Sequence, residues 1–257
     1  MTKEKKQPQF PAEEVSLPSK GLLYPKDSPL SKGVIEMKYM TAREEDILTN
    51  PNFIKKGTAI DKLLESLIVT PIDFKDLLIG DKNAIMVAAR ILGYGADYEV
   101  KLEHPETGIE SDAKINLSDM EDKELNERLV LEGKNEFEFT FPTSKIPITF
   151  KFLTQGDEEK IEKEVEGLKK INKELANSTL RLKHIIMSVN GNYDLKSIRE
   201  FIDNDLLARD ARALRNYINE ILPGINMKVD IEFYDGYVQE GVELPIGLNF
   251  FWPDAAV

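Results

Sequence analysis

The sequence predicts an α+β fold made of antiparallel β-hairpins, with a largely helical C-terminal half. Two patterns predict it. Apolar and polar residues alternate through residues 137–141 and 146–152, as they do in half-buried strands. Between residues 157 and 222, apolar residues instead recur every three or four positions, which is typical of amphipathic helices. A chain of 257 residues can bury a sizeable core, so one or two domains are expected.

Composition and periodicity divide the chain into three parts. Residues 1–14 are polar and rich in Pro, Gln, Lys and Glu, and no core periodicity begins before Val15, so we expect a flexible tail. Residues 15–132 are expected to form an N-terminal α+β unit with a hairpin. Residues 133–257 are expected to begin with a β-hairpin, continue with helices and close with a C-terminal hairpin.

The first unit opens with an ordered loop over residues 17–29, because its Pro and Gly residues favour turns. A short strand over 33–39 follows. Thr41 and Glu44 have the spacing of a capping box, and the helix that they begin is predicted to stop before Pro51. Thr58 is predicted to cap a second helix. Its apolar residues fall on one face: Ile60, Leu63, Leu64, Leu67 and Ile68.

The remaining elements follow from the same patterns. Asp81 is expected to cap a helix that ends at Gly93. A hairpin of residues 98–102 and 113–117 and an acidic helix over 118–131 are predicted next. A hairpin over 137–152 is followed by predicted helices over 157–175, 180–189, 195–202 and 205–222. A last hairpin is predicted over 227–246, with its turn at Asp235-Gly236.

Composition excludes several classes of function. The chain has 34 basic and 46 acidic residues, a net charge of –12, which argues against nucleic acid or an anionic membrane as the main partner. It has no cysteine, so disulfides and thiolate metal sites are excluded. No apolar stretch is long enough for a transmembrane helix, and the N-terminus lacks the apolar core of a secretory signal. We therefore expect a protein of the cytoplasm, or of a particle assembled there.

Motifs that carry catalysis are missing from the sequence. It contains neither the G-x-S-x-G of serine hydrolases nor the P-loop of nucleotide-binding proteins. His104 and His184 are far apart in the chain, and each is expected to be packed or solvated. We predict no catalytic residue, no metal ligand and no cofactor. The alternative left open is a hydrolase whose clustered carboxylates bind Mg²⁺.

Two groups of residues are candidates for binding a partner protein. Large apolar side chains occur in a loop framed by Pro and Gly and again beside the C-terminus, where they either dock onto the body or anchor a partner. Docking is favoured for the C-terminal group, because an exposed aromatic run invites aggregation. The candidates are Leu17, Lys20, Leu22, Leu23, Tyr24, Phe250, Phe251 and Trp252. On the helix over 205–222, Asp210, Arg212 and Arg215 are expected to form surface pairs or to pair with another chain.

Several segments together resemble a known family. They are LPSKGLLY at 17–24, MTAREEDIL at 40–48, IKKGTAIDKLLESLI at 54–68, and the ending LPI and FFWP at 244–246 and 250–253. In these segments, and in their order, the chain resembles the T4-type phage baseplate proteins, which include the baseplate hub assembly protein.

The resemblance implies a structural or assembly protein of a contractile phage tail, acting in baseplate hub assembly through protein–protein contacts and without catalysis. Its partners would be other baseplate hub or tail proteins, and its location the virion baseplate or the host cytoplasm during assembly. The oligomeric state is left open. Besides the hydrolase, a host-directed adaptor outside the virion remains an alternative.

One departure from the family pattern concerns zinc. Family members carry Cys-x-x-Cys knuckles at the turn of the first hairpin and near residues 234–237, which would build a tetrahedral site. Here the first turn has His104 with Glu103 and Glu106, which cannot reproduce four thiolates. We therefore expect zinc-knuckle-like hairpins without a metal, held instead by packing of Tyr234 and Tyr237.

Overall fold

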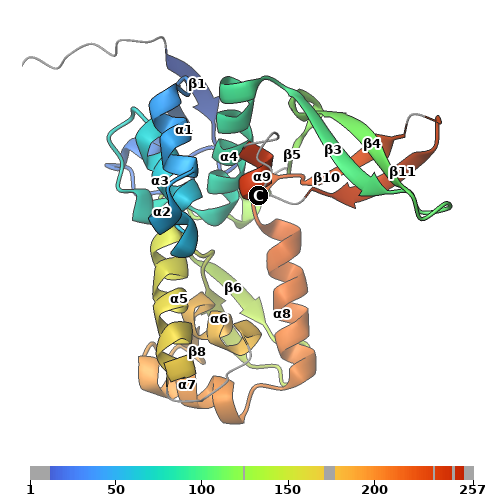
Figure 1. The fold of residues 1–257 in the computed structure, drawn as a ribbon. Helices are drawn as coiled ribbons and strands as arrows, with labels where there is room; N and C mark the ends of the chain where they lie inside the picture. The colour runs from blue at the N-terminus through green and yellow to red at the C-terminus, as the bar shows by residue number, and fades with distance from the viewer. Residues whose placement is uncertain (1–11, 124, 171–176, 234, 245–246, 252–257) are drawn as a thin grey trace, which may run out of the picture.

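The computed structural model describes residues 12–123, 125–170, 177–233, 235–244 and 247–251, and it confirms the α+β class. The elements gather into two bodies (Figure 1). The upper body takes elements from both ends of the chain. The lower body is formed by the stretch between these ends, from the strand that begins at Phe137 to the helix that ends at Ile221.

The N-terminal stretch supplies most helices of the upper body. Its elements are β1 Ala12–Ser16, η1 Pro29–Lys32, β2 Val34–Lys38, α1 Ala42–Leu48, α2 Pro51–Lys55, α3 Ala59–Leu67, η2 Phe74–Asp76 and α4 Ile79–Tyr94. β1 pairs antiparallel with β2, so residues 12–14 lie in a strand although we assigned them to the tail. Sequence patterning missed β1 because it is mostly exposed and shows no alternation. α1 ends before Pro51 as predicted, and Pro51 also begins α2, which was not expected, because proline suits the first position of a helix and Asn50 caps it.

The first hairpin forms where the sequence predicted it. β3 Asp97–Glu103 pairs with β4 Glu110–Asn116. The acidic helix expected over 118–131 is wrong: that stretch holds η3 Leu117–Asp119, β5 Asp122–Lys123 and η4 Glu127–Leu129. Asn116 and Asn126 cap the two short 3₁₀ turns with their side chains, and the stretch lacks the apolar stripe that would hold a longer helix on the core.

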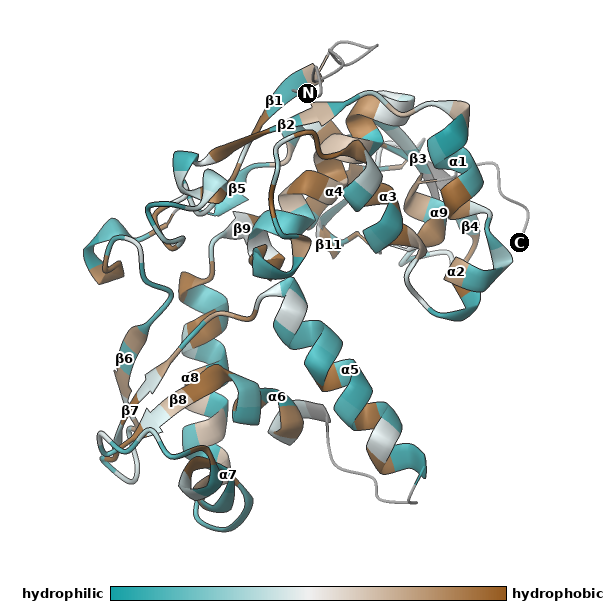
Figure 2. Cartoon of the chain, turned by 90° about the vertical axis from the view of Figure 1, so that its left-hand side faces the viewer, coloured by the Kyte–Doolittle hydropathy of each residue, from teal (hydrophilic) through white to brown (hydrophobic). Residues whose placement is uncertain are grey.

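The lower body is a small sheet covered by helices. Its elements are β6 Phe137–Thr140, β7 Pro147–Phe150, α5 Gln155–Lys170, α6 Asn177–Ile185, β8 Ile186–Val189, α7 Leu195–Asn204 and α8 Ala208–Ile221. The predicted hairpin of β6 and β7 gains a third strand, because residues 186–189, expected to be helical, form β8 beside β7. Figure 2 shows α5 as mainly hydrophilic along its length, with few apolar positions.

After α8 the chain returns to the upper body. β9 Gly224–Ile225 pairs with β5, β10 Lys228–Glu232 pairs with β11 Val238–Glu243, and α9 Leu248–Phe251 packs on α4. Gly80 of α4 permits this return, because a Cβ there would lie 1.8 Å from the carbonyl oxygen of Pro223. The last hairpin and the ending thus pack with the N-terminal elements, whereas our division placed them with residues 133–222. None of the helices in the described part of the chain is both long and apolar enough to cross a bilayer.

Candidate functional site

The loop 17–24 is fastened to α4 by one buried carboxylate. Asp81, in the first turn of α4, accepts hydrogen bonds from the Ser19 amide at 2.9 Å and from the Ser19 hydroxyl at 2.6 Å. It also accepts one from the Tyr24 hydroxyl at 2.6 Å, and that hydroxyl in turn accepts the Leu78 amide at 3.0 Å. Asp81 was expected to cap the helix; instead it lies inside the first turn, and its side chain reaches across to the loop. It therefore ties together segments that are far apart in the sequence.

The pKa values of Asp81 and Tyr24 indicate which group donates and which accepts in this network. Burial raises the pKa of Asp81, and the hydrogen bonds from Ser19 and Tyr24 offset that rise only in part. Burial and the nearby Asp81 raise the pKa of the Tyr24 phenol far above its usual value. Tyr24 therefore remains protonated, and its hydroxyl donates a hydrogen bond to the Asp81 carboxylate. No side chain of this network acts as a base toward solvent, because Ser19, Tyr24 and Asp81 are all buried.

The loop candidates divide into core and surface. Leu17, Leu23 and Tyr24 are buried within this chain, and Leu22 is half-buried. Lys20 is exposed, and its ammonium lies 2.7 Å from the Glu127 carboxylate. Burial removes the first three from direct contact with a partner in this conformation. The expectation of partner binding then rests on Lys20 and on the outer edge of Leu22.

The C-terminal aromatics dock onto the body, as favoured above. Phe250 and Phe251 are fully buried, and the Phe250 ring lies 5.2 Å from that of Tyr98. The buried Arg90 of α4 donates from Nε to the Phe250 carbonyl at 2.9 Å, and its other nitrogens bond the carbonyls of Gly95 and Asp97. Trp252 lies outside the described residues.

Aromatic packing joins the two hairpins where packing was expected to take the place of a metal. The His104 ring lies 4.8 Å from the ring of Phe233 and 4.7 Å from that of Tyr237. Its Nδ1 accepts the amides of Glu106 and Thr107. Nε2 faces the Asp235 carboxylate at 3.3 Å, in an orientation unsuited to a hydrogen bond. Tyr237 takes the expected place in this packing, Tyr234 lies outside the described residues, and the contribution of Phe233 was not foreseen.

The comparisons with known proteins bear on this arrangement. Residues 21–251 match the family model described as T4 bacteriophage base plate protein. The chain belongs to this family. No curated protein and no solved structure matches it. The resemblance noted in the sequence is thereby confirmed over most of the chain, and the protein is a phage baseplate protein.

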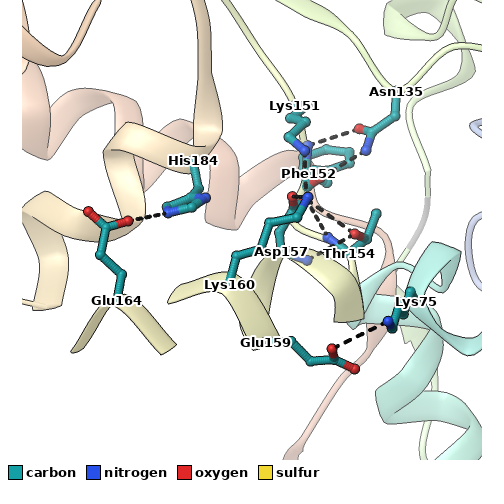
Figure 3. Close-up of polar contacts among 10 residues, drawn as sticks. All are labelled: Lys75, Asn135, Lys151, Phe152, Thr154, Asp157, Glu159, Lys160, Glu164 and His184. Carbon is teal, nitrogen blue, oxygen red and sulfur yellow. Dashed lines mark hydrogen bonds and ion pairs between the residues drawn. The ribbon is translucent and has the colours of Figure 1, made fainter. Parts of the chain in front are cut away.

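In this baseplate protein the two bodies are joined by backbone hydrogen bonds. The Ile79 amide donates to Leu153 at 3.1 Å, and the Gln155 amide donates to Leu77 at 2.8 Å. Around this junction Lys151 bonds Asp157 at 2.6 Å (Figure 3).

Side chains add to the junction from both bodies. Lys75 of the upper body pairs with Glu159 of α5 at 3.9 Å, and Asn135 bonds both backbone groups of Phe152 (Figure 3). Sequence patterning missed the junction because its backbone bonds and its buried Leu77, Leu78 and Leu153 join segments about 75 residues apart, which no local period encodes.

Neither histidine forms part of a reactive cluster. His184 on α6 faces Glu164 of α5 at 3.2 Å (Figure 3), and His104 is enclosed by aromatic rings. Within the described ranges, no group of three or more His, Cys, Asp and Glu side chains is arranged to hold a metal ion.

Proposed function

We propose that this baseplate protein acts in assembly of the baseplate hub of a contractile tail, through protein–protein contacts and without catalysis. The match of residues 21–251 to the baseplate family is the observation that carries the proposal. A match of that extent includes residues of both bodies.

The packing of the two predicted partner-binding segments supports an assembly role. The N-terminal loop is fixed by Asp81 and the ending by Arg90, so both are held on the body before any partner is present. Binding with surfaces that are already ordered avoids the entropy cost of ordering them on contact. Such a surface suits a subunit that must join several neighbours in a fixed geometry.

The proposal is tested by deleting the gene from the phage that encodes this chain. We expect electron micrographs of the lysate to show filled heads but few tails with a complete baseplate, and wild-type protein supplied in trans to restore them. Complete tails with ordinary baseplates in the deletion lysate would contradict the proposal.

A matched variant separates loss of folding from loss of contact. Asp81→Ala removes the central acceptor of the loop network, so it should destabilise the fold, lower the amount of folded protein in the cell and complement poorly. Lys20→Glu is expected to leave the folded protein at its normal level, because Lys20 is exposed. Failure of Lys20→Glu to complement would place a contact at the loop 17–24.

A further inference from the structure

Helix α8 carries a row of arginines on its exposed side. Arg209, Arg212 and Arg215 are all exposed, and their spacing of three residues places them within about 120° of the helix circumference. Figure 1 shows α8 along one edge of the lower body. The row stands out in a chain whose net charge is –12.

Among the described residues, no carboxylate forms an ion pair with this row. Inside α8, the positions three and four residues from each arginine are neutral or are arginine themselves. Asp210, expected to pair with them, is buried and accepts the amides of Thr143 and Ser144 at 2.8 and 2.9 Å. No ion pair of these arginines is present in the part of the chain that the structure describes.

α5 shows the opposite arrangement. Its Lys160 pairs with Asp157, and its Lys163 pairs with Glu159. Like charges three residues apart destabilise a helix, whereas opposite charges stabilise it. The like charges of Arg209, Arg212 and Arg215 therefore do not stabilise α8, whereas Lys160 and Lys163 of α5 each have a carboxylate partner.

An apolar hollow begins where the arginine row ends. Arg215 lines a hollow of about 240 Å³ between α6 and α8, whose walls include Leu182, Ile185, Ile218 and Leu222. An apolar cavity of roughly 150 Å³ is enough for benzene, so this hollow has room for a leucine or phenylalanine side chain. A row of cations beside an apolar hollow suits a segment that presents carboxylates next to a large apolar residue.

We propose that the exposed side of α8, with the hollow beside it, docks an acidic amphipathic segment of a partner protein. Arg209, Arg212 and Arg215 would bind its carboxylates, and the hollow would take its apolar side chain. A protein fits better than nucleic acid. The aromatic ring on the same helix, that of Tyr217, is stacked on Phe139 inside the fold instead of being open to a base.

This inference deepens the proposed function. It rests on that function only in taking the partner to be another tail protein. Its test uses purified chain, so it can fail independently of the particle experiment. The probe is a short fluorescein-labelled helical peptide with glutamates along one face beside two leucines, followed by fluorescence anisotropy at low salt. Arg209→Gln/Arg212→Gln/Arg215→Gln is compared with the control Lys163→Gln/Lys169→Gln/Lys170→Gln, which removes equal charge from α5.

We expect the α8 variant to bind the peptide about tenfold or more weakly and the α5 variant to bind within about twofold of wild type. Replacing the peptide leucines by alanine should weaken binding to the wild type. Equal melting temperatures of the two variants show that both are folded, since glutamine is a good helix former. Equal binding by the α8 variant and the wild type would overturn the proposal.

Two further outcomes would also overturn it. One is a single-stranded oligonucleotide of the same charge binding as tightly as the peptide and losing affinity in the same variant, which would assign the row to nucleic acid. The other is a wild-type dimer in sedimentation that the α8 variant dissociates, which would make a second copy of this chain the occupant.

Discussion

The start of α4 and the start of α1 each bury a carboxylate, and the two are stabilised in different ways. Asp81 meets only neutral donors, Ser19 and Tyr24, and burial raises its pKa. Glu44 is also shielded from solvent, but it lies nearer the protein surface, beside the partly exposed Lys38, whose ammonium lies 2.9 Å away. Burial alone would raise the pKa of Glu44, yet hydrogen bonds from Lys38, Thr41 and Ser66 outweigh it and lower that pKa to about 2.

The difference shows that the depth of burial and the charge of the donors together decide how a buried carboxylate affects stability. A folded-state pKa below the unfolded value adds stability at neutral pH that is lost as the pH falls. A raised folded-state pKa does the reverse, because the extra stability is present at low pH and is lost as the pH rises through it. Variants at Asp81 and Glu44 should therefore show opposite trends with pH.

The largest effect is expected for Asp81→Ala, at roughly 3–5 kcal/mol of unfolding free energy, because it leaves three buried donors of Ser19 and Tyr24 without an acceptor. Urea unfolding at neutral pH measures it. The gap to wild type should widen on acidification, since only the wild type gains from protonation of Asp81. Asp27→Ala, at an exposed position in the same region, is the control and should change little.

The second prediction concerns Glu44→Gln, which is expected to cost roughly 2–3 kcal/mol at neutral pH, because one pKa unit is worth about 1.4 kcal/mol. The native carboxylate loses its advantage as the pH falls from about 4.5, the unperturbed value, towards about 2. The gap between wild type and variant should close over that window. A gap that stayed constant with pH would show that Lys38 does not stabilise the charge.

These networks also show where sequence reasoning stops. The capping box of Thr41 and Glu44 was predicted because both residues belong to one helix turn. The bonds of Asp81 to Ser19 and Tyr24 join positions about sixty residues apart, and no local pattern encodes such a pairing. For the same reason the apolar stripe of α3 could be predicted, whereas the third strand β8 and the return of the last hairpin to the upper body could not.

The candidate partner residues show the same contrast between what local sequence predicts and what only the fold decides. Their apolar or charged type could be read from the sequence, but whether Leu23 faced the core or a partner depended on the fold. Of the arginines of α8, Arg212 and Arg215 were noticed in the sequence and were expected to pair at the surface or with another chain, whereas Arg209 was not. Their lack of a carboxylate became visible only when Asp210 was found to bind the turn at Thr143 and Ser144.

A smaller effect is expected from Tyr24→Phe, which keeps the ring in the core and removes only the hydroxyl between Asp81 and the Leu78 amide. Two buried polar groups then lose one partner each, so the cost should be about 1–3 kcal/mol. Thermal unfolding measures it. In the double variant with Asp81→Ala, the cost of losing the hydroxyl should be smaller, because the bond to Asp81 is already gone and only the Leu78 amide loses a partner. Additive costs would show that the two groups do not interact.

The smallest effect is expected where the loop 17–24 meets solvent. Lys20→Gln removes an ion pair with Glu127 whose two side chains are 60% and 59% exposed. Solvent screens such pairs, so the unfolding free energy should change by no more than about 0.5 kcal/mol. The loop would then have a backbone fixed by Asp81 and an exposed side where substitutions hardly change the unfolding free energy. Such a side suits a partner-binding surface. A loss above about 1 kcal/mol in urea unfolding would instead make Lys20 part of the support of the fold.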